Sequence, residues 1–173
     1  MSRIRNIVLS AISLALLAGV TTAANAADSP STSIKDTSCS PTQPAILDVP
    51  HRLFAAWDKG DASGVAAQFT TDGHMIPNNG VYLTSSSAIA SYYKAAFGGP
   101  LKGTRMIGKP LSVRCLSSGT AVIDGLGGLL LPGDTYTDPE QVPIGQRIIV
   151  SWTAVRINDV YYMKEFQSTQ IQS

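Results

Sequence analysis

Asp124 is the residue whose surroundings most clearly predict chemistry. It interrupts an apolar run, residues 121–126 with the sequence Ala-Val-Ile-Asp-Gly-Leu. A buried carboxylate needs a partner, because burying an unpaired charge is costly. Arg147 lies on the following predicted strand and is the expected partner. Two interpretations stay open: a pocket acid held by the arginine, or an ion pair at a sheet edge that contributes little to stability.

Glu165 and the two histidines, His51 and His74, are the other candidate acid or base groups. His51 falls near the start of a predicted helix, where a solvated side chain is expected. The histidines are far apart and no acidic pair stands at helix spacing, so no metal site is expected. The sequence contains no phosphate loop, dinucleotide fingerprint, nucleophile elbow or C-x-x-C motif, and no cofactor is predicted.

The first 26 residues have the three parts of a cleavable secretory signal peptide. Arg3 and Arg5 provide the positive start, residues 7–20 are almost wholly apolar, and Ala24-Asn25-Ala26 is a small-x-small cleavage site. A membrane anchor is the alternative, but the apolar run is shorter than the roughly 20 residues that a spanning helix needs. We therefore expect cleavage after Ala26, no membrane anchor afterwards, and a periplasmic or secreted protein.

Charge and cysteine content limit the partners and the compartment. The formal net charge is +1 and no cluster of basic residues is visible, so nucleic acid is not an expected partner. Cys39 and Cys115 are the two cysteines of the chain. An even cysteine count in an exported protein predicts a disulfide; two unpaired, buried thiols are the alternative.

The first predicted helix follows a polar leader. Residues 27–44 are rich in Ser, Thr, Pro and Asp without periodicity, which predicts a flexible leader before a domain of residues 45–173. Asp48 is the expected N-cap, and Pro50 suits the first turn because its missing N–H needs no partner there. The helical spacing predicts a buried stripe of Val49, Leu53, Phe54 and Trp57.

Two shorter helices and a hairpin are expected next. Asp61 can cap a second helix that carries Val65, Ala66 and Phe69. Turn signals at Asp72-Gly73 and Asn79-Gly80 bound short apolar pieces and predict a small hairpin. Ser85 or Ser86 is expected to cap a third helix. Its predicted buried face consists of Ile89, Tyr92, Tyr93, Ala96 and Phe97.

Four strands are predicted after the helices. Their expected ranges are Thr104–Leu116, Thr120–Leu131, Ile144–Ile157 and Val160–Ile171. Ser118-Gly119 and Asn158-Asp159 are tight-turn signals, and Pro110 predicts a bulge or a sheet edge. Helices followed by strands joined by tight turns indicate an α+β domain with an antiparallel sheet. Residues 132–143 form a long polar loop, which is expected to cover part of a binding opening.

The order of several short motifs resembles the nuclear transport factor 2-like superfamily. Residues 55–62 (Ala-Ala-Trp-Asp-Lys-Gly-Asp-Ala) resemble its A-W-x-x-G-D-A signature, and residues 69–73 resemble the F-x-x-D-G/A step that follows. Ala88-Ile89 matches the usual x-A-I position, and residues 166–169 (Phe-Gln-Ser-Thr) are similar to the close of SnoaL-like and SgcJ/EcaC-type members. The resemblance implies a cone-shaped, curved antiparallel sheet wrapped around three N-terminal helices, and a homodimer.

The family's ketosteroid isomerases use an oxyanion tyrosine and an aspartate base. The resemblance places these at Leu53 and Pro77, which can neither donate nor accept the required proton, so isomerase chemistry is not expected. A supporting pocket tyrosine falls at Tyr93. The same resemblance turns Met75 toward the pocket and His74 away from it, because side chains alternate across a strand.

The sequence therefore predicts a domain that binds a small hydrophobic molecule of unknown identity. The expected lining is Trp57, Phe69, Met75, Tyr93 and Arg147. One alternative is an enzyme acting on a hydrophobic carbonyl substrate, with Asp124, Glu165 or His74 as weak candidates for the acid or base. Another is a non-catalytic module for dimerisation or protein binding. An apolar cavity at the open end of the cone would favour the binding domain. A carboxylate or histidine that points into this cavity would favour the enzyme, and a cone filled by side chains would favour the non-catalytic module.

Overall fold

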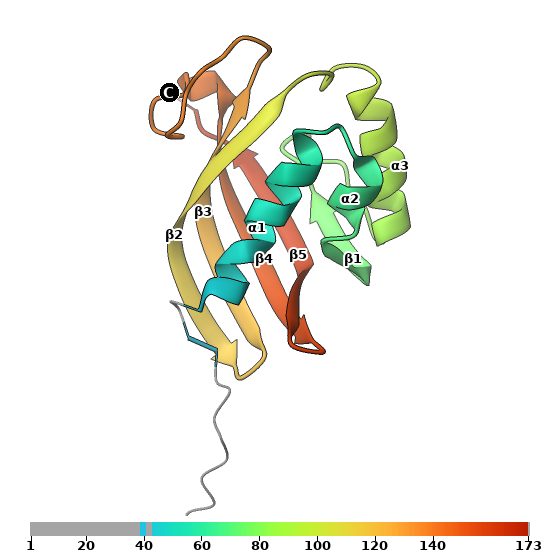
Figure 1. The fold of residues 1–173 in the computed structure, drawn as a ribbon, viewed down its shortest axis with the longest axis vertical. Coiled ribbons are helices and arrows are strands. Elements are labelled where there is room, and N and C mark those ends of the chain that lie inside the picture. Colours follow the sequence, from blue (N-terminus) through green and yellow to red (C-terminus); the bar gives the residue numbers. More distant parts are fainter. Residues whose placement is uncertain (1–38, 41–42, 173) are drawn as a thin grey trace, which may run out of the picture. The chain divides into compact units, whose positions relative to one another are not determined.

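A computed structural model describes residues 39–40 and 43–172 and shows an α+β domain, as expected (Figure 1). The predicted signal peptide and most of the predicted leader lie outside these residues. None of the described helices is long and apolar enough to cross a membrane. The elements are α1 (Pro44–Trp57), α2 (Ala62–Ala66), β1 (Phe69–Ile76), α3 (Ser86–Phe97), β2 (Arg105–Ser117), β3 (Thr120–Leu130), the 3-10 helix η1 (Ile144–Gln146), β4 (Arg147–Ile157) and β5 (Val160–Gln170).

The five strands form one sheet in the order β1-β5-β4-β3-β2, which bends around α1 (Figure 1). Strands β2 to β5 are antiparallel, but β1 pairs with β5 in parallel. The sheet is therefore mixed, whereas an antiparallel one was expected. The β4–β5 turn has positive φ at Asn158 (48°) and Asp159 (64°), as a tight hairpin requires. No such turn joins β1 to β5, so chain connectivity does not fix their relative direction.

Helix α1 begins at Pro44, one turn before the expected cap at Asp48. Pro44 is favourable at the start because the first N–H groups of a helix have no partner. Asp48 instead forms an i,i+4 ion pair with Arg52 inside the helix. Pro50 therefore lies in the helix interior, where its missing N–H leaves the carbonyl of Ile46 without its usual partner.

The segment after α1 differs from expectation at Phe69. Asp61 caps α2 as predicted, because its side chain accepts a hydrogen bond from the N–H of Gly64. Phe69 does not belong to that helix but begins β1. The predicted Asp72-Gly73 turn is a register shift within β1. A short hairpin does remain, through a bridge between Met75 and Leu83.

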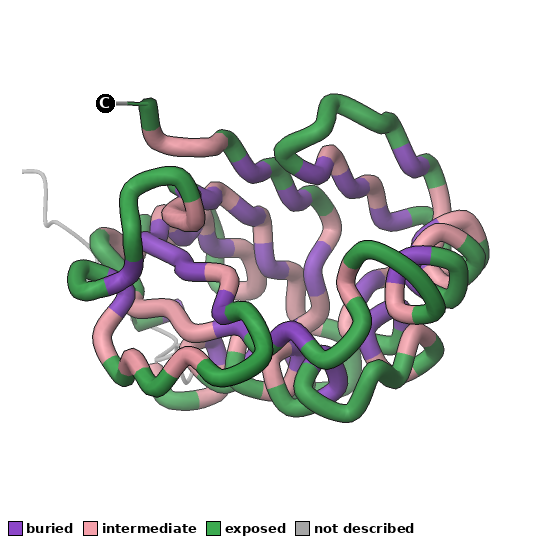
Figure 2. The backbone as a smooth tube through the Cα atoms, turned by 90° about the horizontal axis from the view of Figure 1, so that it is seen from above, coloured by how far each residue is buried: buried purple, intermediate pink, exposed green. Residues whose placement is uncertain are grey.

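Local signals predicted the later elements well. Ser85 caps α3 by accepting a hydrogen bond from the N–H of Ala88. Strand β2 is the edge of the sheet and shifts register between Pro110 and Ser112, so both features expected at the proline are present. Buried and exposed residues alternate along much of the strands, which gives the sheet an inner and an outer face (Figure 2).

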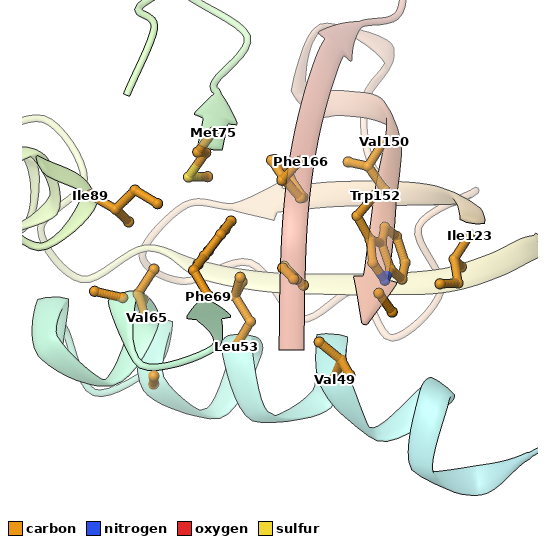
Figure 3. Close-up of a cluster of buried hydrophobic side chains, with 14 of the residues drawn as sticks. Val49, Leu53, Val65, Phe69, Met75, Ile89, Ile123, Val150, Trp152 and Phe166 are labelled. Atoms are coloured by element: carbon orange, nitrogen blue, oxygen red, sulfur yellow. The ribbon is translucent and has the colours of Figure 1, made fainter. Parts of the chain in front are cut away.

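The apolar core lies between the inner face of the sheet and the helices (Figure 3). Val49 and Leu53 of α1 point to Trp152 and Phe166 on the central strands. A disulfide joins Cys39 to Cys115 on β2, across a sequence separation of 76 residues. The predicted bridge is thus present, and it ties the segment before α1 to the edge strand.

Candidate functional site

A cavity of about 270 Å³ lies between α1, α3 and the inner face of the sheet. We call it the cone cavity; its wall includes Trp57, Met75, Tyr93, Ile148 and Ser168. Helix α1 provides Trp57 from its buried stripe, α3 provides Tyr93, and the strands provide the other three. Three of the five predicted lining residues therefore meet here: Trp57, Met75 and Tyr93.

Trp57 forms part of the wall without offering its polar edge to a ligand. The indole N–H donates a hydrogen bond of 3.1 Å to Oγ1 of Thr104, which is itself buried. The ring packs edge-on against Tyr93 and Phe97, with centroids 5.1 Å and 5.2 Å away. Thr104 therefore satisfies the indole N–H within the core, so this N–H does not need a ligand.

The hydroxyl of Tyr93, in contrast, has no such partner among the described residues. Its side chain is 2% exposed, and no hydrogen bond in the described part of the chain involves its hydroxyl. Burial raises the pKa of Tyr93 far above its ordinary value, because the phenolate would lose its hydration. The hydroxyl therefore stays protonated and can exchange hydrogen bonds with a ligand, but it cannot serve as a base.

The rest of the cone cavity carries no charge. Its other polar groups are the hydroxyl of Ser168 and, toward the helix α3 side, Asn78, Asn79 and Tyr92. The Asn79 amide donates to the Tyr92 hydroxyl at 2.8 Å. Leu53 and Pro77, which stand where the isomerases have their catalytic tyrosine and aspartate, both line this cavity. No described residue that lines it is a carboxylate, a histidine or another charged group.

Asp124 lies on the outer face of the sheet, away from the cone cavity. Its carboxylate accepts hydrogen bonds of 2.8 Å from Ser151 and 2.8 Å from Ser112, and Arg114 is 3.8 Å away. The hydrogen bonds from Ser151 and Ser112 hold the pKa of Asp124 below its usual value. The predicted partner was wrong: Arg147 pairs with Gly128 across the strands and donates to the carbonyls of Val142 and Glu140.

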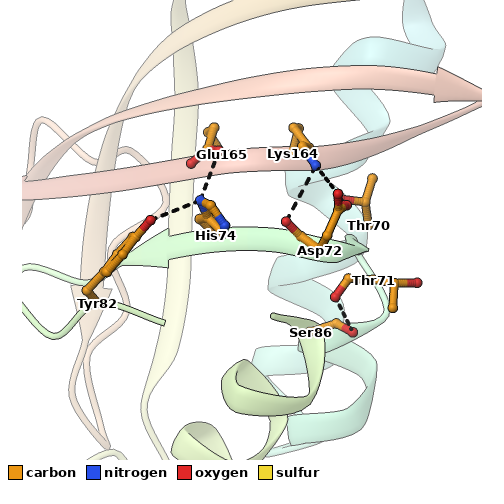
Figure 4. Close-up of polar contacts among 8 residues, drawn as sticks. All are labelled: Thr70, Thr71, Asp72, His74, Tyr82, Ser86, Lys164 and Glu165. Carbon is orange, nitrogen blue, oxygen red and sulfur yellow. Dashed lines mark hydrogen bonds and ion pairs between the residues drawn. The ribbon is translucent and has the colours of Figure 1, made fainter. Parts of the chain in front are cut away.

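His74 and Glu165 come together, also on the outer face (Figure 4). Nδ1 of His74 is 3.2 Å from Oε1 of Glu165 and 3.2 Å from the Tyr82 hydroxyl. Their neighbours Met75 and Phe166 point inward, as strand alternation requires. Beside them Asp72 pairs with Lys164, whose hydrogen bond lowers the pKa of Asp72. The described residues contain no group of three His, Cys, Asp or Glu that could hold a metal ion.

Two further predictions for the site are corrected. Phe69 is a core residue, 4% exposed, that packs edge-on against Phe166 with a centroid distance of 6.5 Å; it does not line the cone cavity. The long loop contributes no residue to the lining of the cone cavity. Lys109 on β2 pairs with Asp138 and Glu140 of that loop, at 3.4 Å and 2.8 Å. The loop is therefore held by the edge strand through ion pairs.

A second cavity of about 160 Å³ lies on the other side of α1, between this helix and strands β2 and β3. We call it the helix-side cavity; its wall includes Pro50, Phe54, Gly108, Gly125 and Trp152. Sequence reasoning missed it. The available signal was the glycine content of β2 and β3, since glycine within a strand often marks a close approach by another group.

No protein-family model and no curated protein sequence matches the chain. Solved structures do match. A Nostoc punctiforme domain of unknown function with a cystatin-like fold is 24% identical with a TM-score of 0.66, over 75% of this chain and 77% of that one. An NTF-2 like protein of unknown function from Shewanella oneidensis is 16% identical with a TM-score of 0.59, over 73% and 97%. Aln2 from a Streptomyces species is 19% identical with a TM-score of 0.60, over 73% and 89%.

These identities are low, so the matches establish the fold and leave the function to be argued from the site. In this chain three helices precede the long strands, and the curved sheet packs on α1. The chain thus has the cystatin-like fold of the nuclear transport factor 2-like proteins.

Proposed function

We propose that the protein is an exported domain that binds a neutral, largely apolar small molecule in the cone cavity. The observation that carries this proposal is the chemistry of the wall: the side chain of Tyr93, whose hydroxyl has no hydrogen-bond partner among the described residues, within an uncharged, mostly apolar surface. A ligand with one hydroxyl or carbonyl group would satisfy Tyr93 and bury its carbon skeleton. Pockets of this kind usually combine an apolar lining with few well-placed polar groups.

The position of the acidic groups favours binding over catalysis. Asp124, Glu165 and His74 lie on the outer face, and a general acid or base must reach the substrate at hydrogen-bond distance. A purely structural module would have its cone filled by side chains, whereas the cone cavity of this protein has an open volume of about 270 Å³. The homodimer implied by the family resemblance remains part of this proposal, and light scattering of the purified protein would test it.

Export is proposed from the signal-peptide pattern, and the disulfide supports it because such bonds persist in oxidising compartments. N-terminal sequencing of protein recovered from the periplasm or the medium is expected to begin at Ala27. A recovered protein that still carries Arg3 and Arg5 would contradict both the cleavage site and the proposal of a cleaved signal peptide.

Replacing Tyr93 by phenylalanine tests the binding site. The variant should bind a neutral alcohol such as 1-dodecanol about fivefold more weakly, which corresponds to a hydrogen bond of about 1 kcal/mol. Its free energy of unfolding should change little, because no internal hydrogen bond is lost. Displacement of a neutral fluorescent naphthylamine measures the affinity, and urea unfolding measures the stability.

Tyr161 provides the matched control. It is 1% exposed, lies outside the cone cavity, and its hydroxyl is 3.4 Å from Oε1 of Gln43. Tyr161→Phe should leave alcohol binding unchanged and lower the free energy of unfolding by about 0.5–1 kcal/mol. If Tyr93→Phe instead loses stability while keeping its affinity for the alcohol, Tyr93 is a core residue and the proposed site is wrong.

A further inference from the structure

The cone cavity and the helix-side cavity share part of their walls. Leu53, Met106 and Phe166 line both of them. These three side chains come from α1, β2 and β5, and each is at least nine-tenths buried. The two cavities therefore adjoin at these side chains. Leucine and methionine change rotamers without polar cost, and methionine in particular adapts to irregular gaps.

Three glycines of β2 and β3 form part of the wall of the helix-side cavity. Gly108 on β2 pairs with Gly127 on β3, and Gly125 lies two residues before Gly127 on the same strand. A Cβ at Gly108 would be 3.0 Å from Cζ of Phe54, and one at Gly125 would be 3.2 Å from Trp152. Phe54 and Trp152 therefore lie close against the sheet at these glycines, where an added Cβ would force the neighbouring side chain to shift.

The surface that this cavity presents is almost entirely carbon. Trp152 is 5% exposed, and its Nε1 is buried without a partner among the described residues, so the ring offers the cavity carbon atoms. The charged or titratable residues of the wall are His51 and Lys109. His51 is exposed, and Nζ of Lys109 pairs with Glu140 at 2.8 Å. An apolar group is thus the occupant that this wall suits.

We propose that the ligand is elongated and occupies both cavities. Its polar head accepts or donates a hydrogen bond at Tyr93 in the cone cavity. Its unbranched hydrocarbon tail passes between Leu53, Met106 and Phe166 into the helix-side cavity. This inference rests on the proposed function and adds the ligand class: a neutral, linear amphipathic molecule such as a long-chain alcohol or ester.

The volumes agree with this assignment. A cavity of about 150 Å³ lined by apolar side chains holds a benzene molecule in an engineered protein, so the helix-side cavity, at about 160 Å³, has room for about six carbons of a tail. The cone cavity, at about 270 Å³, holds the head and the first part of the chain. A compact ligand of similar mass would fill the cone cavity and leave the second one empty.

A series of straight-chain primary alcohols tests the inference in the full-length mature protein. Affinity should rise by about fourfold for each added methylene, and the rise should continue beyond the chain length that the cone cavity alone can hold. Displacement of the fluorescent naphthylamine gives each dissociation constant. A branched alcohol with the same number of carbons as a long straight one should bind at least tenfold more weakly.

Two variants narrow the helix-side cavity without touching the cone cavity. Phe54→Trp and Leu47→Trp each enlarge a half-buried side chain that lines only the helix-side cavity. Both variants should bind short alcohols with the affinity of the unchanged protein. Their affinity should no longer rise with chain length for the long alcohols. Ala55→Leu is the control, because Ala55 is exposed on the same helix and lines neither cavity.

The outcomes separate this inference from the proposed function. Binding that stops improving at short chains in the unchanged protein would overturn the elongated ligand and leave the cone cavity as the site. Unaltered chain-length dependence in both tryptophan variants would overturn it as well. If no alcohol of any length binds, the proposed function fails together with this inference.

Discussion

Replacing both Cys39 and Cys115 by serine is expected to lower the free energy of unfolding by about 4 kcal/mol. The bridge joins residues 76 apart, and in the chain-entropy model a loop of this length restricts the unfolded chain by about that amount. The loss is large against a typical total stability of about 5–15 kcal/mol. Urea unfolding of the oxidised protein and of the double variant, monitored by tryptophan fluorescence, measures it.

Reduction provides the control for this prediction. The unchanged protein treated with a reductant should unfold at nearly the same urea concentration as the double serine variant, because both lack the same restriction. Alkylation of the unreduced protein, followed by intact mass, should show no modified thiol. Two alkylated thiols in that sample, or a stability difference under about 1 kcal/mol, would contradict the prediction.

Short-range signals in the sequence predicted the elements that depend on local chemistry. The Ser85 cap, the edge position of Pro110 and the Asn158-Asp159 turn each follow from one or two residues and their backbone preferences. The predicted start of helix α1, however, was wrong. Asp48 is a good cap by residue type, but Pro44 is also a good first residue, and propensity alone does not rank the two.

Pairing between distant strands could not be predicted in the same way. The prediction that Asp124 pairs with Arg147 required the two residues to stand opposite each other on neighbouring strands. In the structure Asp124 stands opposite Ser151, while Arg147 stands opposite Gly128. A shift of a few residues along the strand changes every partner, and the sequence carries little information about it.

The sequence predicted residues of the cone cavity but not the helix-side cavity, again because strand register could not be predicted. Trp57, Met75 and Tyr93 were placed from helical stripes, strand alternation and a family resemblance, and all three line the cone cavity. The helix-side cavity depends on three glycines that meet across two strands. Glycine has no side chain whose pattern could be followed, so the close approach of other side chains that it permits is visible only once the register is known.

Trp57→Ala is expected to cost about 3–5 kcal/mol of unfolding free energy, as is usual when a large buried aromatic side chain is truncated. Trp57 is 6% exposed and contacts Tyr93 and Phe97 edge-on, so the truncation removes apolar contacts between α1 and α3. It would also enlarge the cone cavity on the side of Tyr93. Thermal and urea unfolding measure the loss in stability.

The hydrogen bond from Trp57 to Thr104 can be separated from this packing. Thr104→Val leaves the indole N–H without its acceptor and the Leu101 carbonyl without the 2.8 Å bond from the Thr104 hydroxyl. That change should cost about 1–3 kcal/mol in the unchanged protein. In a Trp57→Phe background it should cost less, because no indole N–H remains to be stranded. Equal costs in the two backgrounds would show that the bond contributes nothing measurable, and that Trp57 stabilises the cavity wall through packing alone.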